Sequence, residues 1–362
     1  MTAPKVGRRW HDLDPDTQRA ALARAQAQTG RDSVILEKDI WVVWALNALF
    51  STCALAPDQK PTAGRARMVF KGGTSLSKAY GHINRFSEDI DVTLELQAHD
   101  GRTPEEIRTT SRSRRDAYRD EYLSLCLNFI EGSILPALQR QAELEGAPLR
   151  LRLDTADEAT PSVWMTYPSV TSAGLDYIQK AVKFEFGARN VITPAHQQQV
   201  TTYIAKVAEI AAAVDLPVAL PNVLAAERTF LEKATALHVL CRRGSTLEPD
   251  VLDRKTHRFA RHLDDLCRLA DQGVAALALA DQGLVQDVVD TKEAFFKEGG
   301  ISYHEVLQGQ TQLVPEGRLR EVLEKDYRQM QTAGMLGDSR VPFAELLAQL
   351  QTLQDQMRLL GS

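Results

Sequence analysis

The stretch from residue 69 to residue 96, VFKGGTSLSKAYGHINRFSEDIDVTLEL, most constrains what this 362-residue chain can fold into. A short apolar run ends at Gly72-Gly73, and Thr74 follows as an N-cap residue before apolar side chains at helical spacing. The stretch closes on apolar and polar residues that alternate from residue 90 to residue 95, which is the period of a β-strand. The sequence therefore predicts a strand, a glycine turn, a helix and a second strand.

Asp89 and Asp91 are two residues apart at this second strand, so their side chains leave the same face. Carboxylates at such a spacing repel each other unless a cation offsets the repulsion, and hard oxygen ligands suit Mg²⁺ or Mn²⁺. The glycine turn offers backbone N–H groups and a helix N-terminus, which attract phosphate. A Gly-Gly turn or an Asp-x-Asp pair is ordinary alone, but their combination in one strand–helix–strand unit predicts nucleotidyl transfer from an NTP. The predicted nucleotide-binding residues of this turn are Lys71, Gly72, Gly73, Thr74, Ser75 and Lys78.

The composition is that of an ordinary globular protein, with 44% hydrophobic and 25% charged residues. The net charge of −5 means that a nucleic-acid substrate requires a local basic patch. The four scattered cysteines predict reduced core residues, with neither a disulfide framework nor a zinc site. The N-terminus lacks a signal-peptide core and no apolar stretch is long enough to span a membrane, so we expect a cytoplasmic protein.

Residues 104–145 are expected to be helical, with Tyr118, Tyr122, Leu125 and Phe129 as a buried stripe. A second stripe at the same spacing borders it and consists of Arg108, Arg112, Arg115 and Arg119. These arginines have two interpretations. They hold acceptor RNA or triphosphate, or they form a solvated face balanced by neighbouring acidic residues.

Three strand-like segments follow, at residues 149–153, 163–167 and 182–186. In the last of them Glu185 and Lys183 leave one face while two phenylalanines leave the other. Glu185 has the geometry to stand beside Asp89 and Asp91 as a third catalytic carboxylate if the two strands are neighbours. The alternative is an exposed strand glutamate. Strand signals end near residue 195, so we expect a catalytic domain with an N-terminal helical cap at residues 1–195. A helical domain at residues 196–362 is expected to contribute to the nucleotide and acceptor cleft.

Lys233 lies at the edge of the apolar stripe of a predicted helix over residues 227–241. A lysine in that position needs an anionic partner or a route to water. The triphosphate of an NTP would serve as the anion. The alternative is a packing lysine whose ammonium reaches water or Glu232.

The motifs GGTSLSK and RFSEDID resemble the AbiEii/AbiGii toxin branch of the polymerase-β-like nucleotidyltransferase superfamily. The resemblance extends to an Ile-x-Glu-Lys-Asp-Ile-Trp segment near residue 35, to KFEFGAR around Glu185, and to a C-terminal segment matched on Asp326, Tyr327 and Met330, which we interpret as structural. An Arg-Asp-x-x-Asp-Leu motif is matched on Arg261 and Asp265 but departs at His262, where the family commonly has Asp. Asp265 is therefore either a proton acceptor in catalysis or a partner of Arg258 or Arg261.

We accordingly expect an α/β fold, with a polymerase-β-like sheet core, N-terminal helices and a C-terminal all-helical domain. The resemblance implies the toxin of an AbiE-type toxin–antitoxin or phage-defence pair, with a cognate antitoxin encoded beside it. It further implies transfer of NMP to an acceptor, with the tRNA 3′ end as the main hypothesis. The alternatives are nucleotidylation of a protein hydroxyl and a non-catalytic nucleotide-binding regulator. An intact Asp89/Asp91 pair argues against the regulator, because a binding-only site gains little from repelling carboxylates.

Overall fold

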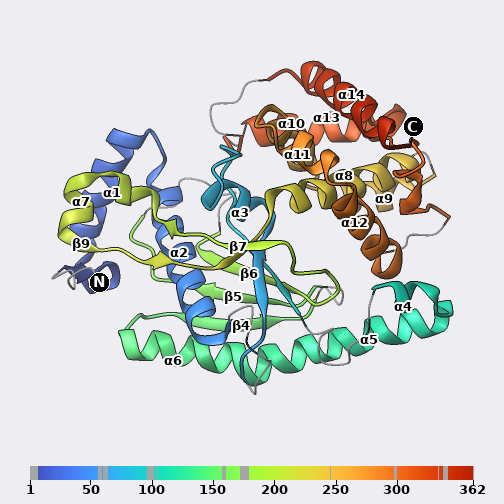
Figure 1. Cartoon of the computed structure of the whole chain (residues 1–362). Helices are drawn as coiled ribbons and strands as arrows, with labels where there is room; N and C mark the ends of the chain where they lie inside the picture. Colours follow the sequence, from blue (N-terminus) through green and yellow to red (C-terminus); the bar gives the residue numbers. More distant parts are fainter. Residues whose placement is uncertain are drawn as a thin grey trace. The chain divides into compact units, whose positions relative to one another are not determined.

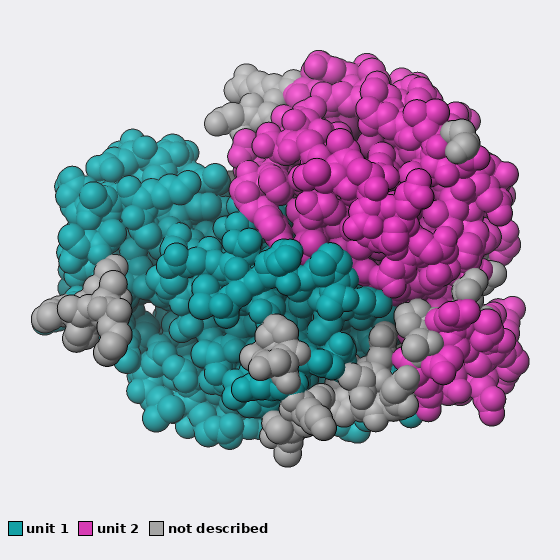
Figure 2. Space-filling view, viewed as in Figure 1, with its two compact units in different colours: residues 1–79, 87–100, 120–223 teal, residues 80–86, 101–119, 224–362 magenta. Residues whose placement is uncertain are grey.

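A mixed β-sheet accompanied by many helices confirms the expected α/β fold class in this computed structural model (Figure 1). The structure describes residues 7–55, 59, 64–95, 102, 104–156, 160–171, 179–244, 246–296, 300–332, 334–336 and 341–361. The chain divides into two compact units (Figure 2). Unit 1 comprises residues 1–79, 87–100 and 120–223, and unit 2 comprises residues 80–86, 101–119 and 224–362. The expected domain boundary after residue 195 stays a prediction.

In the described part of unit 1, seven strands form one sheet in the order β4-β5-β6-β3-β2-β11-β7. Strand β3 runs parallel to β6 and antiparallel to β2, which in turn runs parallel to β11. The bounds are β2 Met68–Lys71, β3 Ile90–Leu94, β4 Arg150–Asp154, β5 Ser162–Thr166, β6 Ala181–Gly187, β7 Ala195–Gln197 and β11 Asn222–Leu224. The short strands β1 Arg8–Arg9 and β9 Val214–Asp215 pair with each other, as do β8 Val200–Thr201 and β10 Val218–Ala219.

One face of this sheet is the apolar core of unit 1. Phe70, Val92 and Phe186 are register partners across β2, β3 and β6, and each is at most 1% exposed. Ile90 and Phe184 form the next row and are fully buried as well. Because successive side chains of a strand alternate between faces, Asp91 and Glu185 lie on the opposite face.

The helix α2, Ser33–Cys53, packs against β6, against α1 (Pro15–Thr29) and against α6 (Leu135–Glu145). Asp32 caps it by accepting a hydrogen bond from the Val34 backbone N–H at 2.8 Å. The charged residues 37–39 of the Ile-x-Glu-Lys-Asp-Ile-Trp segment lie within this packing helix, away from its start. They lie one turn inside the helix and are buried, so each requires a partner within the fold.

The helix that follows the strand β2, α3, spans Gly72–Lys78, with Lys71 at its N-cap position. The expectation that Thr74 caps this helix is wrong. The helix begins two residues earlier, and Thr74 is a fully buried residue inside its first turn.

The long helical region is confirmed as α4 (Pro104–Thr109), α5 (Arg112–Phe129), a π-helical turn at Ile130–Ile134, and α6. Its expected buried stripe is wrong in part. Of the expected stripe only Tyr122 is buried, Tyr118 and Phe129 are half-buried, and Leu125 is 36% exposed. Cys126 and Ile130 continue the buried face beyond Tyr122 at four-residue spacing.

Among the described residues of unit 2, helices predominate, together with 3₁₀ turns such as Tyr303–Glu305. Helix α10 packs against α8, α13 and α14, and α8 also contacts α11 and α12. Asp326 of α13 accepts hydrogen bonds from the backbone N–H of Arg258 (3.1 Å) and of Ala260 (2.8 Å) at the start of α10, which supports its structural interpretation. The bounds are α8 Ala226–Arg243, α9 Pro249–Thr256, α10 Ala260–Asp271, α11 Val274–Ala280, α12 Gln282–Phe295, α13 Gly317–Thr332 and α14 Phe343–Arg358.

The expectation that strands end near residue 195 is wrong, because β7 to β11 lie between residues 195 and 224, along with the helix α7 (Ala208–Ala213). These strands have two or three residues each, too few to show a period. The four cysteines are buried and free, as expected. Within the described residues, no helix has the length and apolarity needed to cross a membrane.

Candidate functional site

A row of charged side chains crosses the polar face of the sheet in unit 1. Asp91 on β3 is the register partner of Lys71 on β2 and of Glu185 on β6. Directly paired residues on neighbouring strands project from the same face with Cβ atoms about 4.5–5.5 Å apart. Glu185 was expected to stand beside the aspartates only if its strand is the neighbour of theirs. The strand β6 is the neighbour of β3, and Glu185 is paired with Asp91.

Gly72 brings the backbone of the turn against the Asp91 carboxylate. Its φ is +80°, and a Cβ atom at this position would lie 2.0 Å from Asp91 Oδ2 and 2.8 Å from Asp91 Cγ. Any other residue would suffer both a left-handed backbone and a direct clash with the carboxylate. The absence of a side chain at Gly72 thus allows the turn to lie against the Asp91 carboxylate.

Asp89 precedes β3 by one residue and is tied to the turn through its backbone. Thr74 Oγ1 lies 2.5 Å from the Asp89 carbonyl oxygen, to which it donates, and 2.9 Å from Ser87 Oγ. Ser75 Oγ donates to the Gly72 carbonyl at 2.9 Å. The Thr74 hydroxyl therefore ties the turn to the Asp89 loop, and the Ser75 hydroxyl closes the turn on itself.

Glu185 and Lys78, two of the predicted site residues, each have a protein partner. Glu185 forms an ion pair with Lys183 on its own strand, and both side chains are about a quarter exposed. Lys78 Nζ lies 2.5 Å from Asp39 Oδ1 and 3.7 Å from the centroid of the Tyr203 ring. Burial lowers the pKa of Lys78, and the Asp39 carboxylate opposes that shift. The predicted contact of Lys78 with phosphate stays a prediction, while the structure shows that it anchors α3 to α2.

A second buried pair, which sequence reasoning did not identify, fixes the loop before β3. Lys38 Nζ donates to Glu88 Oε2 at 2.6 Å and to the Gln179 carbonyl at 2.9 Å. Glu88 directly precedes Asp89, so α2 positions the segment that carries the candidate metal ligand. The signal available in the sequence was the run Glu37-Lys38-Asp39 inside an otherwise apolar helix, because buried charges need partners.

Unit 2 contains a buried charge cluster around Asp265, whose side chain has no exposed surface. Arg85 Nε and Nη2 donate to the two Asp265 oxygens at 2.6 and 2.8 Å. Lys233 Nζ lies 3.0 Å from Asp265 Oδ2 and 2.9 Å from His262 Nδ1. The expected alternatives for Asp265, a pair with Arg258 or Arg261, are therefore replaced by Arg85 and Lys233.

The electrostatics of this cluster follow from burial and from the two cations. Burial alone would raise the pKa of Asp265, but Arg85 and Lys233 together hold it below its usual range. Burial, with Lys233 and Arg261 nearby, lowers the pKa of His262 well below its ordinary value. Lys233 Nζ bridges His262 Nδ1 and Asp265 Oδ2, and Arg85 engages both oxygens of Asp265. The geometry therefore favours Asp265 as a residue that positions Lys233.

Three of the four predicted arginines line a cavity of about 290 Å³ in unit 2. Arg112, Arg115 and Arg119 of α5 face it together with Ala294 and Phe295 at the end of α12. Arg119 lies 3.7 Å from Asp116, an exposed pair of small energetic weight. The side chain of Arg108 lies outside the described residues.

The donor set at the strand face fits a divalent cation. Mg²⁺ is commonly held by one or two carboxylates and by substrate phosphates, with water completing its shell. Asp89 and Asp91 supply hard oxygen ligands, and the Gly72 backbone, which leaves no room for a Cβ, brings the turn to the same carboxylate. In the parts of the chain that the structure describes, no group of three His, Cys, Asp or Glu residues is arranged to hold a metal by itself. The fit is that of a cation shared between protein and nucleotide.

A family model of nucleotidyl transferases matches most of the chain. This model, described as nucleotidyl transferase AbiEii toxin, type IV toxin–antitoxin system, matches residues 61–349. Among solved structures, the MenT4 nucleotidyltransferase toxin from Mycobacterium tuberculosis H37Rv is similar at 18% sequence identity with a TM-score of 0.41. That match covers 97% of this chain and 100% of the MenT4 chain. No curated protein sequence matches the chain.

Proposed function

The chain belongs to the AbiEii family of nucleotidyltransferase toxins of type IV toxin–antitoxin systems, and on that premise we propose that it transfers NMP from an NTP to the 3′ end of tRNA and so blocks translation. Nucleotidyltransferases of this kind use an NTP and a divalent metal, and a toxin of such a system has a cognate antitoxin. We place the reaction in the cytoplasm, where NTP and tRNA are available, and its biological setting in phage defence.

The observation that carries the proposal is the row Lys71–Asp91–Glu185 with the Gly72 turn packed against Asp91. Acidic side chains on adjacent strands beside a turn rich in backbone N–H groups match the two demands of the reaction. One demand is to hold a triphosphate, and the other is to stabilise charge that develops as the α-phosphate is attacked.

Each predicted residue receives a role in this proposal. Asp89 and Asp91 hold Mg²⁺ or Mn²⁺, which when bound neutralises phosphate charge and polarises the α-phosphate. Glu185, the register partner of Asp91, serves as the third carboxylate. The backbone of Gly72 and Gly73 contacts the phosphates, with Lys71 adding positive charge from the neighbouring strand.

The remaining predicted residues have supporting roles in this proposal. Thr74 and Ser75 keep the turn in shape through their internal hydrogen bonds, and Lys78 keeps α3 in place through Asp39. Lys233 contributes an ammonium for the triphosphate, held in position by Asp265. The acceptor RNA is held by the stripe of Arg108, Arg112, Arg115 and Arg119.

The reaction can be tested by incubating the protein with each α-labelled NTP and total tRNA in the presence of Mg²⁺. We expect label on RNA, and no label after metal removal with EDTA or in Asp91→Ala. Label on protein instead would establish nucleotidylation of a protein hydroxyl. Absence of label on both RNA and protein, with any NTP and with either metal, would contradict the proposal and favour a nucleotide-binding regulator.

A further inference from the structure

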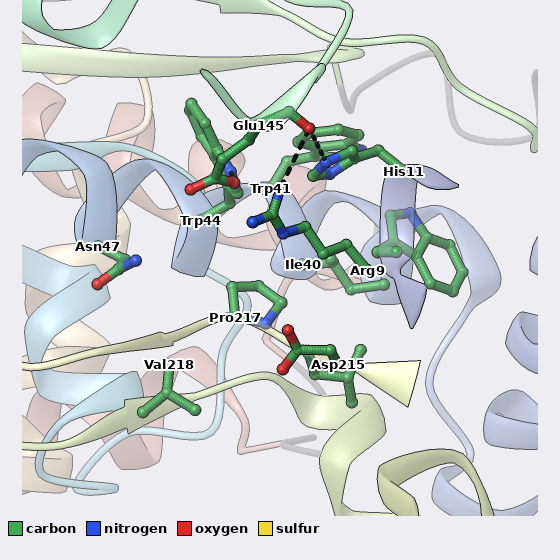
Figure 3. A pocket seen from close by; sticks show the side chains of 12 residues that line it. Arg9, His11, Ile40, Trp41, Trp44, Asn47, Glu145, Asp215, Pro217 and Val218 are labelled. Atoms are coloured by element: carbon green, nitrogen blue, oxygen red, sulfur yellow. Dashed lines mark hydrogen bonds between the residues drawn. The ribbon is translucent and has the colours of Figure 1, made fainter. Parts of the chain in front are cut away.

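A separate pocket of about 350 Å³ lies in unit 1, a volume within the range of small-molecule sites (Figure 3). It is lined by residues of β1, of α2, of the end of α6 and of the segment at 215–218. None of the residues proposed above for catalysis, metal binding or nucleotide binding lines it. A ligand of this pocket would therefore bind outside the site proposed for the transfer reaction.

One wall of the pocket is a stacked aromatic cluster. The rings of His11 and Tyr167 stack on Trp41 with centroids 6.2 and 5.5 Å away, and Trp44 meets it at 6.4 Å in an edge contact. Trp44 Nε1 donates to Glu145 Oε2 at 2.7 Å, which fixes the second indole. Rings held in this way form a preshaped apolar wall, the kind of surface against which a planar ligand packs.

Three polar groups at the pocket have no partner among the described residues. Trp41 is 1% exposed, yet its Nε1 makes no hydrogen bond. No hydrogen bond or ion pair engages the side chains of Asn47 and Asp215 within the described part of the chain. Buried polar groups are almost always hydrogen-bonded in folded proteins, so the unpaired N–H of the buried Trp41 indicates a missing acceptor. The half-buried side chains of Asn47 and Asp215 leave an amide and a carboxylate available to a polar ligand at the same cavity.

Arg9 adds a planar cation to these groups. Its Nη1 donates to the Glu145 carbonyl oxygen at 3.3 Å, which holds the guanidinium at the pocket. Figure 3 shows the guanidinium between Glu145 and Pro217, with the side chains of Asn47 and Asp215 to either side of it. Guanidinium planes stack on nucleobases, and amide and carboxylate groups read base edges through hydrogen bonds.

We propose that this pocket binds a purine nucleobase, either of a free nucleoside or of a base presented by RNA. A purine edge carries both N–H donors, which Asp215 requires, and ring or carbonyl acceptors, which Asn47 and the Trp41 N–H require. Its two fused rings suit the aromatic wall and the Arg9 plane. Guanine presents two adjacent N–H donors to a carboxylate, so guanosine should bind more tightly than adenosine, and cytidine should bind weakest.

The experiment titrates the full-length protein with guanosine, adenosine and cytidine in EDTA, which keeps the metal-dependent reaction out of the measurement. Three of the four tryptophans line the pocket, so intrinsic fluorescence and calorimetry both report binding. Asp215→Asn and Asn47→Ala should each weaken guanosine binding by roughly tenfold, as expected for losing a hydrogen bond to the ligand. The matched controls are the exposed residues Asp16 and Asn128, as Asp16→Asn and Asn128→Ala, which should bind as the parent does.

A guanine-containing oligonucleotide provides the second arm and separates the two sources of the base. Saturable binding of guanosine supports a free nucleoside, and binding of the oligonucleotide alone, lost in Asp215→Asn, supports a base within RNA. Failure of both probes, or binding that both pocket variants leave unchanged, would overturn the proposal. Asp91→Ala should retain this binding, so loss of transfer and loss of the pocket are distinguishable.

Discussion

Gly72 shows how one residue can limit the geometry of a site. Its φ of +80° is strained for any residue with a side chain, and its Cβ would meet Asp91 Oδ2 at 2.0 Å. Gly81 offers a comparison in the same loop region, because its φ of +68° carries similar strain while nothing lies within 4 Å of its Cβ position. Comparing substitutions at Gly72 and Gly81 therefore distinguishes the effect of backbone strain from the effect of a clash with the Asp91 carboxylate.

We predict that Gly72→Ala abolishes transfer, whereas Gly81→Ala retains it. Both variants should lose about 1–2 kcal/mol of stability from the left-handed backbone, and Gly72→Ala should lose more because the carboxylate must move. Thermal unfolding and the tRNA-labelling assay measure the two effects. Wild-type transfer in Gly72→Ala would show that the turn does not need to approach Asp91.

The carboxylates themselves give a second residue-scale prediction. Asp89→Ala or Asp91→Ala should abolish transfer and growth inhibition without unfolding the protein, because both side chains are partly exposed and neither belongs to the apolar core. Circular dichroism and thermal unfolding provide the check on the fold. Full activity of either variant in Mg²⁺ would remove the central claim about this strand face.

Lys233 is the residue whose role depends most on its surroundings. Its ammonium is nine-tenths buried between Asp265 and His262, so the alternative in which it reaches water or Glu232 does not describe the structure. Lys233→Ala should weaken NTP binding by about 1.5–3 kcal/mol, the range for a hydrogen bond to a charged group. The exposed Lys325→Ala serves as the charge-matched control in the same titration. Unchanged NTP affinity in Lys233→Ala would leave it a structural partner of Asp265.

At the scale of elements, α10 carries adjacent aspartates with opposite behaviour. Asp264 is buried, with 3% of its surface exposed, directly before Asp265 in the sequence. Burial raises the pKa of Asp264 to about 6, and the charge of Asp265 adds to the shift. A carboxyl with a raised pKa in the folded state binds its proton more tightly than in the unfolded chain. Its contribution to stability is therefore lost as pH rises from about 4 to about 6.

We predict that Asp264→Asn removes this dependence. Between pH 4 and pH 7 the parent should lose about 2–3 kcal/mol of its free energy of unfolding relative to Asp264→Asn. This loss corresponds to the rise of the Asp264 pKa from its ordinary value to about 6. Chemical denaturation at several pH values measures it. Asp253→Asn, an exposed change on α9 in the same unit, should follow the parent curve. A parent-like curve for Asp264→Asn would show that the buried carboxyl titrates normally.

Local sequence patterns were sufficient to predict the strands that carry the candidate carboxylates. They were not sufficient to predict which strands are neighbours or which charged side chains pair with each other. The alternation around Asp91 and around Glu185 placed both on strand faces, and only the sheet order shows that these strands are neighbours. Arg85 finds Asp265 at a sequence separation of 180, and Lys38 finds Glu88 at a separation of 50. Such pairings depend on how helices and strands pack, which no local period encodes.

At the scale of the whole molecule, the distribution of charge decides where RNA can bind. A net charge of −5 gives no general attraction for a polyanion, so binding requires a concentrated positive surface. Arg112, Arg115 and Arg119 line one cavity in unit 2 and provide such a surface. In the alternative interpretation the three arginines form a solvated helix face that does not bind RNA.

Changing Arg112 and Arg115 together to Gln should weaken acceptor RNA binding and flatten its salt dependence. The reason is that the variant contacts fewer phosphates, so its binding releases fewer counterions from the RNA. NTP binding should change little, since these arginines are not among the residues proposed to hold the triphosphate. The control changes Arg318 and Arg320 to Gln, two exposed arginines of α13 in the same unit, which removes the same net charge elsewhere. Filter binding of tRNA across a salt series measures affinity and slope for both double variants. If the Arg112/Arg115 variant keeps the parent affinity and slope, the cavity is not the acceptor site, and the basic residues Arg242, Arg243 and Arg254 become the next surface to test.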